Sequence, residues 1–174
     1  ENALFSYFGC DPRWVYRPVN RLDKGTSGLM AVALTPHAQQ LLQKQLHTPD
    51  MTRRYLAVTD GVPQQPEGIL DAPIAKVDGA TVKRCVSPDG KPSRTHYRVV
   101  ATYENRALVE LQLETGRTHQ IRVHLASIGC PVFGDFLYGT ESLLLPRRFA
   151  LHSHFLTVKH PITGETLTFV SPLP

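Results

Sequence analysis

The segment RALVELQLE, residues 106–114, constrains the fold most, because its side chains alternate between apolar and polar. Successive side chains of a β-strand point to opposite faces of a sheet, whereas those of an α-helix repeat every 3.6 residues. The pattern therefore predicts a strand with one face on a core and the other toward solvent. Its inward side chains are expected to be Val109, Leu111 and Leu113.

Several other segments also predict strands. The apolar run SGLMAVAL, residues 27–34, is typical of a buried strand, and RYLAVT, residues 54–59, of another that ends at a turn. Residues 62–68, VPQQPEG, indicate a loop. Residues 148–158 and 165–170 flank the turn HPITG, so they predict a hairpin.

Helices are fewer. Thr35 and Pro36 are typical of an N-cap and a first helical position, and HAQQLLQKQL continues from them. Thr118 could cap a second helix, which Gly129 would end. One face of that helix would carry Ile121, Leu125 and Ile128. Because many strands separate the two helices, residues 1–174 are predicted to form a single α+β domain, with a mixed, largely antiparallel central sheet flanked by helices and loops.

The composition sets weaker limits. The net charge of +4 and the pI of about 9.1 permit a polyanionic partner without requiring one. The three cysteines are widely spaced and form no CxxC pair, which argues against a disulfide or zinc framework and favours a reducing cytoplasm. No apolar run approaches the roughly 20 residues of a membrane span.

Several familiar chemistries lack their motifs. The turn GTSG does not have the spacing of a phosphate-binding loop, and no Gly-x-Ser-x-Gly elbow occurs. The histidine pairs do not match the HExxH metal pattern, so we expect structural histidines, no metal and no cofactor. These pairs are His119 with His124, and His152 with His154.

Two charged residues stand in unusual surroundings. Asp23 lies in NRLDKGTSG between Arg21 and Lys24, beside a turn. Arg122 lies in the first turns of a predicted helix, beside its apolar stripe. A half-buried guanidinium needs a carboxylate partner, and Asp23 is a candidate. The residues alone leave open whether such a pair is a structural bridge or part of an active site.

Tyr55 follows two arginines, an arrangement that suits base stacking and phosphate contact but also fits a core tyrosine with a bonded hydroxyl. The segment 76–98 holds six cations against Asp78 and Asp89. A solvated hairpin and a polyanion-binding surface both remain open for it.

Taken together, these segments resemble the RluA-type RNA pseudouridine synthases. The family signature His-Arg-Leu-Asp-Arg-x-Thr-Ser-Gly is similar to residues 20–28, and Thr-Gly-Arg-Thr-His-Gln-Ile-Arg-Val-His stands intact at residues 115–124. GCPVFGDFLYG at 129–139 and ALHSHFLTVKHPITGE at 150–165 resemble downstream blocks. The resemblance covers nearly the whole chain.

The resemblance implies roles for individual residues. Asp23 matches the catalytic aspartate, Tyr55 the tyrosine that stacks on the target base, and Arg122 the cation paired with the aspartate. Residues implied to contact the substrate are Asn20, Arg21, Arg117, His119, Gln120 and Leu151. Asn20 replaces the usual His, and Lys24-Gly25 replaces an Arg and a polar residue, and these departures are expected to affect target affinity or choice.

The implied activity is isomerisation of a flipped-out uridine to pseudouridine in ribosomal or transfer RNA, by a cytoplasmic monomer without a cofactor. Asp23 could attack C1′ or C6, or remove the C2′ proton. The strand that members carry before the first signature and the S4 module of some members are not found in residues 1–174, so the expectation is that the sheet lacks one strand or that this strand was removed.

Two alternatives stay open. One is an RNA-binding assembly factor of the same fold without catalysis. The other is a glycoside hydrolase, which would need a second carboxylate facing Asp23, with Glu114 and Asp135 as the nearest choices.

Overall fold

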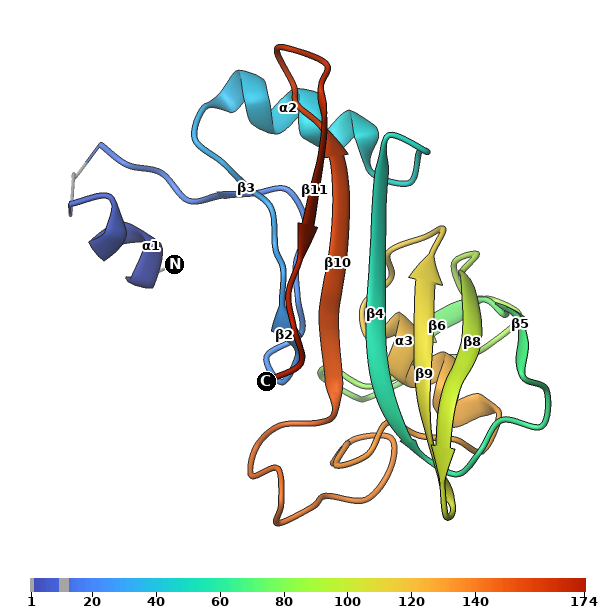
Figure 1. The fold of residues 1–174 in the computed structure, drawn as a ribbon. Helices are drawn as coiled ribbons and strands as arrows, with labels where there is room; N and C mark the ends of the chain where they lie inside the picture. Colours follow the sequence, from blue (N-terminus) through green and yellow to red (C-terminus); the bar gives the residue numbers. More distant parts are fainter. Residues whose placement is uncertain (1, 10–12) are drawn as a thin grey trace.

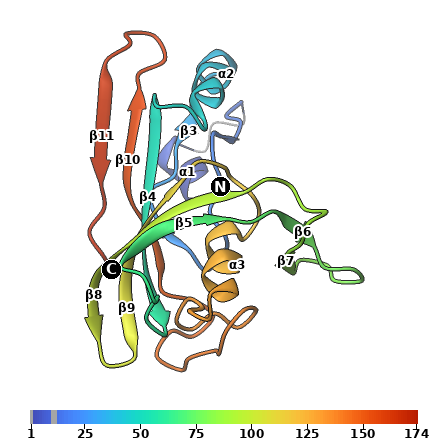
Figure 2. The same ribbon diagram turned by 90° about the vertical axis from the view of Figure 1, so that its right-hand side faces the viewer.

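The computed structural model describes residues 2–9 and 13–174, which form a sheet with helices on one face (Figures 1 and 2). In chain order the elements are α1 (Asn2–Tyr7), β1 (Arg17–Pro18), β2 (Ser27–Gly28), β3 (Val32–Ala33), α2 (Pro36–Gln45), β4 (Met51–Asp60), β5 (Glu67–Asp71), β6 (Ile74–Lys76), β7 (Arg84–Val86), β8 (Arg94–Tyr103), β9 (Arg106–Leu113), α3 (Gln120–Ser127), β10 (Leu151–Lys159) and β11 (Thr166–Val170).

The central sheet has the order β11-β10-β4-β9-β8-β5, and every neighbouring pair along it is antiparallel. The short strand β2 adds a parallel pairing to β10. The predicted α+β class with a largely antiparallel sheet is therefore confirmed. Strands β6 and β7 form a separate two-stranded ribbon that projects to the right of the sheet in Figure 2.

The strongest local patterns correspond to observed elements. The alternating segment forms β9, where Val109 and Leu111 are fully buried and Leu113 is half-buried. The strand predicted at 54–59 lies within the longer β4, and β10 with β11 forms the predicted hairpin. At the start of α2, the Thr35 hydroxyl accepts a hydrogen bond from the Ala38 N–H at 3.2 Å, which confirms this cap.

The prediction of one buried strand at 27–34 is wrong. The run divides into β2, which pairs with β10, and β3, which pairs with β1. Gly28 has a φ of +102°, and a Cβ there would lie 2.2 Å from the Ser153 carbonyl oxygen. The positive φ takes the backbone of Gly28 out of the extended region, so the strand is interrupted there.

The start and one face of the second helix also differ from expectation. Helix α3 begins at Gln120, and its N-cap is His119 in a left-handed conformation, without a side-chain cap, rather than Thr118. Ile121 and Leu125 are buried as predicted, but Ile128 is 38% exposed because the helix ends before it.

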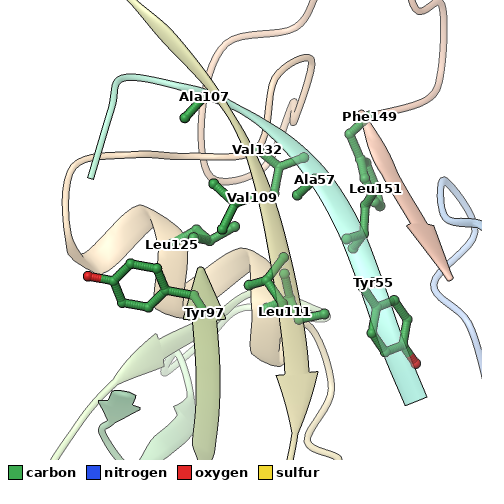
Figure 3. Close-up of a cluster of buried hydrophobic side chains, with 11 residues drawn as sticks. Tyr55, Ala57, Tyr97, Ala107, Val109, Leu111, Leu125, Val132, Phe149 and Leu151 are labelled. Carbon is green, nitrogen blue, oxygen red and sulfur yellow. The ribbon is translucent and has the colours of Figure 1, made fainter. Parts of the chain in front are cut away.

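The main core lies between α3 and the sheet (Figure 3). Its buried members include Tyr55, Ala57, Val109, Leu111, Leu125, Val132, Phe149 and Leu151. A second cluster packs α2 against β4 and β10 through Leu42, Met51 and Leu156. None of the helices in the described residues is long and apolar enough to cross a bilayer.

Candidate active site

A pocket of about 1050 Å³ gathers both signature segments in one place. The first contributes residues 20–25 to its lining and the second contributes residues 116–119 and Arg122, although about a hundred positions separate them. Tyr55, from the middle of β4, and Phe149, just before β10, also line the pocket. The sheet thus brings distant parts of the chain to one concave site.

A tight turn holds Asp23 at this pocket. The Thr26 N–H donates to the Asp23 carbonyl oxygen at 2.9 Å, which closes the turn. Gly25 is buried in it, and a Cβ there would lie 2.5 Å from the Phe149 ring, so glycine allows the close packing. The Asp23 carboxylate stays 25% exposed and can meet a ligand.

The predicted pair between Asp23 and Arg122 is present. The Arg122 Nη1 donates to Asp23 Oδ2 at 3.3 Å, and the Arg122 side chain is only 3% exposed. The expectation that a half-buried guanidinium would find a carboxylate is correct. Asp23, however, is the weaker of two partners.

Asp135 is the main partner of Arg122. Its carboxylate is fully buried and accepts from Arg122 Nε at 2.6 Å and from Nη2 at 2.8 Å. It also accepts the backbone N–H groups of Leu137 and Tyr138. A two-point bond of this kind fixes the plane of the guanidinium. Only the Nη1 edge is left to face Asp23.

The charge of Arg122 is secure despite its burial. Desolvation acts to lower the pKa of Arg122, but the hydrogen bonds and the negative charge of Asp135 outweigh it, and the pKa is raised. Aromatic rings add further stabilisation, with the Phe149 centroid 4.2 Å and the Tyr138 centroid 5.0 Å from the guanidinium carbon.

Strand alternation places Arg53 and Tyr55 on the pocket side of β4 and Arg54 on the other. Arg54 stacks on Phe155 at 4.4 Å and lies 3.9 Å from Glu110. Tyr55 is 4% exposed and belongs both to the core and to the pocket lining, so it is a core tyrosine, and its role in base stacking stays a prediction. Burial raises the pKa of the Tyr55 phenol, which therefore stays protonated near neutral pH.

Four of the other residues predicted to contact substrate line the pocket, namely Asn20, Arg21, Arg117 and His119. The Asn20 Oδ1 accepts the Ala31 N–H at 3.0 Å, so this side chain also supports its own loop.

Gln120 and Leu151 are not among the lining residues. Gln120 is buried and bonds to Thr115, the Arg117 N–H, Thr95 and the Arg94 carbonyl, while Leu151 lies in the main core. Their geometry is that of structural residues.

Sequence reasoning missed Asp135 as the anchor of Arg122, and it missed Arg53, Tyr138 and Phe149 in the site. For Arg53 a signal existed, because it stands two positions before Tyr55, directly before the strand predicted at 54–59, and the observed β4 extends back to Met51. The sequence indicated that Arg122 needs a carboxylate partner, and in the structure both Asp23 and Asp135 bond to it.

The alternative carboxylates do not form a facing pair with Asp23. Asp135 is bonded to Arg122, and Glu114 lies on the exposed side near His96 and Arg94. Glu141, an exposed residue, is a further carboxylate in the lining. Within the described residues, no group of three or more His, Cys, Asp or Glu side chains could hold a metal ion.

Comparisons with known proteins agree with this geometry. Residues 14–127 match the family model described as RNA pseudouridylate synthase. The chain is 44% identical over 156 residues to an uncharacterized RNA pseudouridine synthase of Bacillus subtilis, covering 90% of this chain and 55% of that protein. It is 43% identical to the ribosomal large subunit pseudouridine synthase D of Haemophilus influenzae, covering 90% and 52%.

The solved structure of human RNA pseudouridylate synthase domain containing 1 superimposes with a TM-score of 0.79 at 28% identity, covering 97% of this chain and 71% of that one. The chain spans about half the length of the curated relatives that it matches.

Proposed function

This chain belongs to the RNA pseudouridylate synthase family, and on that premise we propose that it isomerises specific uridines of structured RNA to pseudouridine. The N1–C1′ bond breaks, the base turns, and C5 joins C1′, while C5 loses a proton and N1 gains one. The observation that carries the proposal is Asp23, a partly exposed carboxylate held toward the pocket by an arginine that Asp135 fixes.

Asp23 is proposed as the nucleophile or base. It could attack C1′ or C6, or remove the C2′ proton, and each step requires a carboxylate near the sugar–base junction. A uridine inside a stacked helix cannot reach a recessed carboxylate, so the target must be flipped into the pocket. Tyr55 at the floor would contact the base, and Arg21 and Arg117 would contact phosphates at the rim.

The target is proposed to be ribosomal RNA, with transfer RNA as the alternative that the resemblance allows. The support is that several relatives are named ribosomal large subunit pseudouridine synthases. We expect the protein to act as a cytoplasmic monomer. Mapping pseudouridines in cells with and without the gene would identify the RNA and the uridine.

Release of tritium from RNA labelled at uridine C5 tests the activity. An active synthase exchanges that hydrogen with water as C5 joins C1′. The alternative function, an assembly factor without catalysis, has its support in Asn20, which replaces the usual His of the signature. Such a factor would bind the same RNA and release no tritium above a heat-inactivated control.

The ribbon of β6 and β7 is proposed to guide the RNA backbone. A second cavity of about 480 Å³ shares Gly116, Arg117 and Thr118 with the main pocket. Its lining also includes the cations Lys76, Arg84 and Lys91. Arg94, in the same basic segment, is instead occupied by Asp71 and Glu114.

Replacing Lys83 or Lys91 with Gln should weaken RNA binding without changing thermal stability, because both side chains are exposed. Removing one cation that neutralises a phosphate should reduce the log–log salt slope by somewhat less than about one unit. Binding titrations at several salt concentrations measure this. Arg98→Gln, on the opposite sheet face beside Glu110, is the matched control. An equal loss of RNA affinity in this variant would contradict RNA binding localised to the β6–β7 ribbon.

Tyr55→Leu should weaken RNA binding more than Tyr55→Phe does, if the ring contacts the flipped base. Base–aromatic stacking is worth roughly 1–3 kcal/mol, or about 5- to 150-fold in affinity. Because Tyr55 is buried, affinity should be measured on protein shown to be folded by its melting curve. Tyr103→Leu, at an exposed tyrosine, is the control. Wild-type affinity in Tyr55→Leu would refute the stacking role.

A further inference from the structure

We propose that His119 is a neutral hydrogen-bond donor in the pocket, with its proton kept on Nε2 by Tyr138, and that it stabilises the negative charge that develops on the uracil ring. The charge state and tautomer are properties of the folded protein alone. The stabilising role rests on the proposed function.

The backbone at His119 is unusual. Its φ of 59° and ψ of 19° are left-handed, a conformation that costs free energy in a residue other than glycine. This conformation holds the imidazole at the N-terminal end of α3, among the pocket-lining residues. Nε2 lies 3.9 Å from Asp23 Oδ2, beyond hydrogen-bond distance but facing the same space.

The partners of Tyr138 determine the tautomer. The Tyr138 oxygen accepts the backbone N–H of Arg84 at 2.9 Å and lies 2.7 Å from His119 Nδ1. A phenol has one proton to donate. If Nδ1 carried a proton, Tyr138 would accept twice and its own O–H would point at neither neighbour. If Tyr138 donates to Nδ1, then the Arg84 N–H, the Tyr138 hydroxyl and His119 Nδ1 all have hydrogen-bond partners. The imidazole proton then lies on Nε2.

The charges around the ring favour its neutral form. Burial lowers the pKa of His119, and the positive charges of Arg122 and Arg84 lower it further. Asp23 and Asp135 act in the opposite direction, but the net pKa remains below the ordinary value of 6.5. A neutral ring does not pair with Asp23 as an imidazolium would, so the carboxylate stays available.

The proposed reaction develops negative charge on the uracil ring, which the His119 Nε2–H would stabilise. On each of the three routes open to Asp23, the electron pair of the N1–C1′ bond stays with the uracil ring, and the ring carbonyl oxygens share the charge. A fixed N–H directed at developing charge lowers the barrier without giving up its proton. The proton that leaves C5 and the one that reaches N1 are therefore carried by other groups.

Nitrogen-15 NMR of histidine-labelled protein tests the tautomer. His119→Asn, which tolerates a left-handed backbone, assigns the signal by its loss. The expected result is an Nε2–H tautomer with a pKa below 6.5. Tyr138→Phe keeps the ring beside Arg122 and should increase the Nδ1–H population. An Nδ1–H form, or an imidazolium at pH 7, would overturn the proposal whatever the activity.

Kinetics test the role in the reaction. His119→Asn should lower kcat by roughly 100-fold, as loss of a donor to developing charge does, and leave KM nearly unchanged. Tyr138→Phe should lower kcat by a smaller factor. Wild-type kcat in both variants would overturn the stabilising role. If the NMR result holds but wild-type protein releases no tritium, the proposed function fails and the tautomer assignment stands.

Discussion

Asp23→Asn should abolish pseudouridine formation while the protein remains folded. The substitution keeps the size of the side chain and its contact with Arg122 but removes the charge and the nucleophilic oxygen. Because Asp23 is partly exposed and Arg122 retains Asp135, the fold loses little. Loss of a catalytic acid–base group costs roughly 10²- to 10⁴-fold in rate, and loss of a nucleophile costs more. Tritium release and a melting curve measure the two effects.

Asp50→Asn is a matched control, since Asp50 is an exposed carboxylate bonded to Lys159. Its turnover should equal that of the wild type. Turnover of Asp23→Asn within about tenfold of wild type would remove Asp23 from the role of nucleophile or base.

Arg122→Met should lower thermal stability and activity together. The fully buried Asp135 would lose its two-point partner, and breaking a buried pair costs on the order of 3–5 kcal/mol. Activity falls because Asp23 loses the group that orients it. Little of either loss should be recovered at low salt, since the pair is shielded from solvent ions. Melting curves and turnover at several salt concentrations check this.

The double variant Arg122→Met with Asp135→Leu separates the two losses. Replacing both members of a buried pair with apolar residues is often neutral for stability, so the melting temperature should partly recover. Activity should not recover. If Arg122→Met instead behaves like Lys83→Gln, with an unchanged melting temperature, weaker RNA binding and a smaller salt slope, Arg122 is a phosphate contact rather than the support of Asp23.

Local patterns were sufficient for several elements. The alternation of β9, the strand within β4 and the Thr35 cap of α2 depend on neighbours a few residues apart, and such neighbours act on the chain in any context. The two signature segments likewise indicated Asp23 and Arg122 without coordinates, because polar motifs of this length are specific, and a third segment indicated Tyr55.

Only the tertiary structure decided how those residues are held. Asp23 and Arg122 are 99 positions apart in the sequence. Asp135 bonds to the same guanidinium from a loop, and the course of a loop is not predicted by a periodic pattern of residues. The division of residues 27–34 between β1 and β10 depends on pairing with β10, a strand far along the chain. The left-handed backbone of His119 and its bond to Tyr138 depend on where the chain runs after α3. The sequence by itself indicated Asp23, Tyr55 and Arg122 as residues of one site and determined which segments favour strand or helix, since residue type and near neighbours carry that information. Partners, distances and protonation were decided by folding, because they depend on segments that meet only when the sheet and α3 pack together.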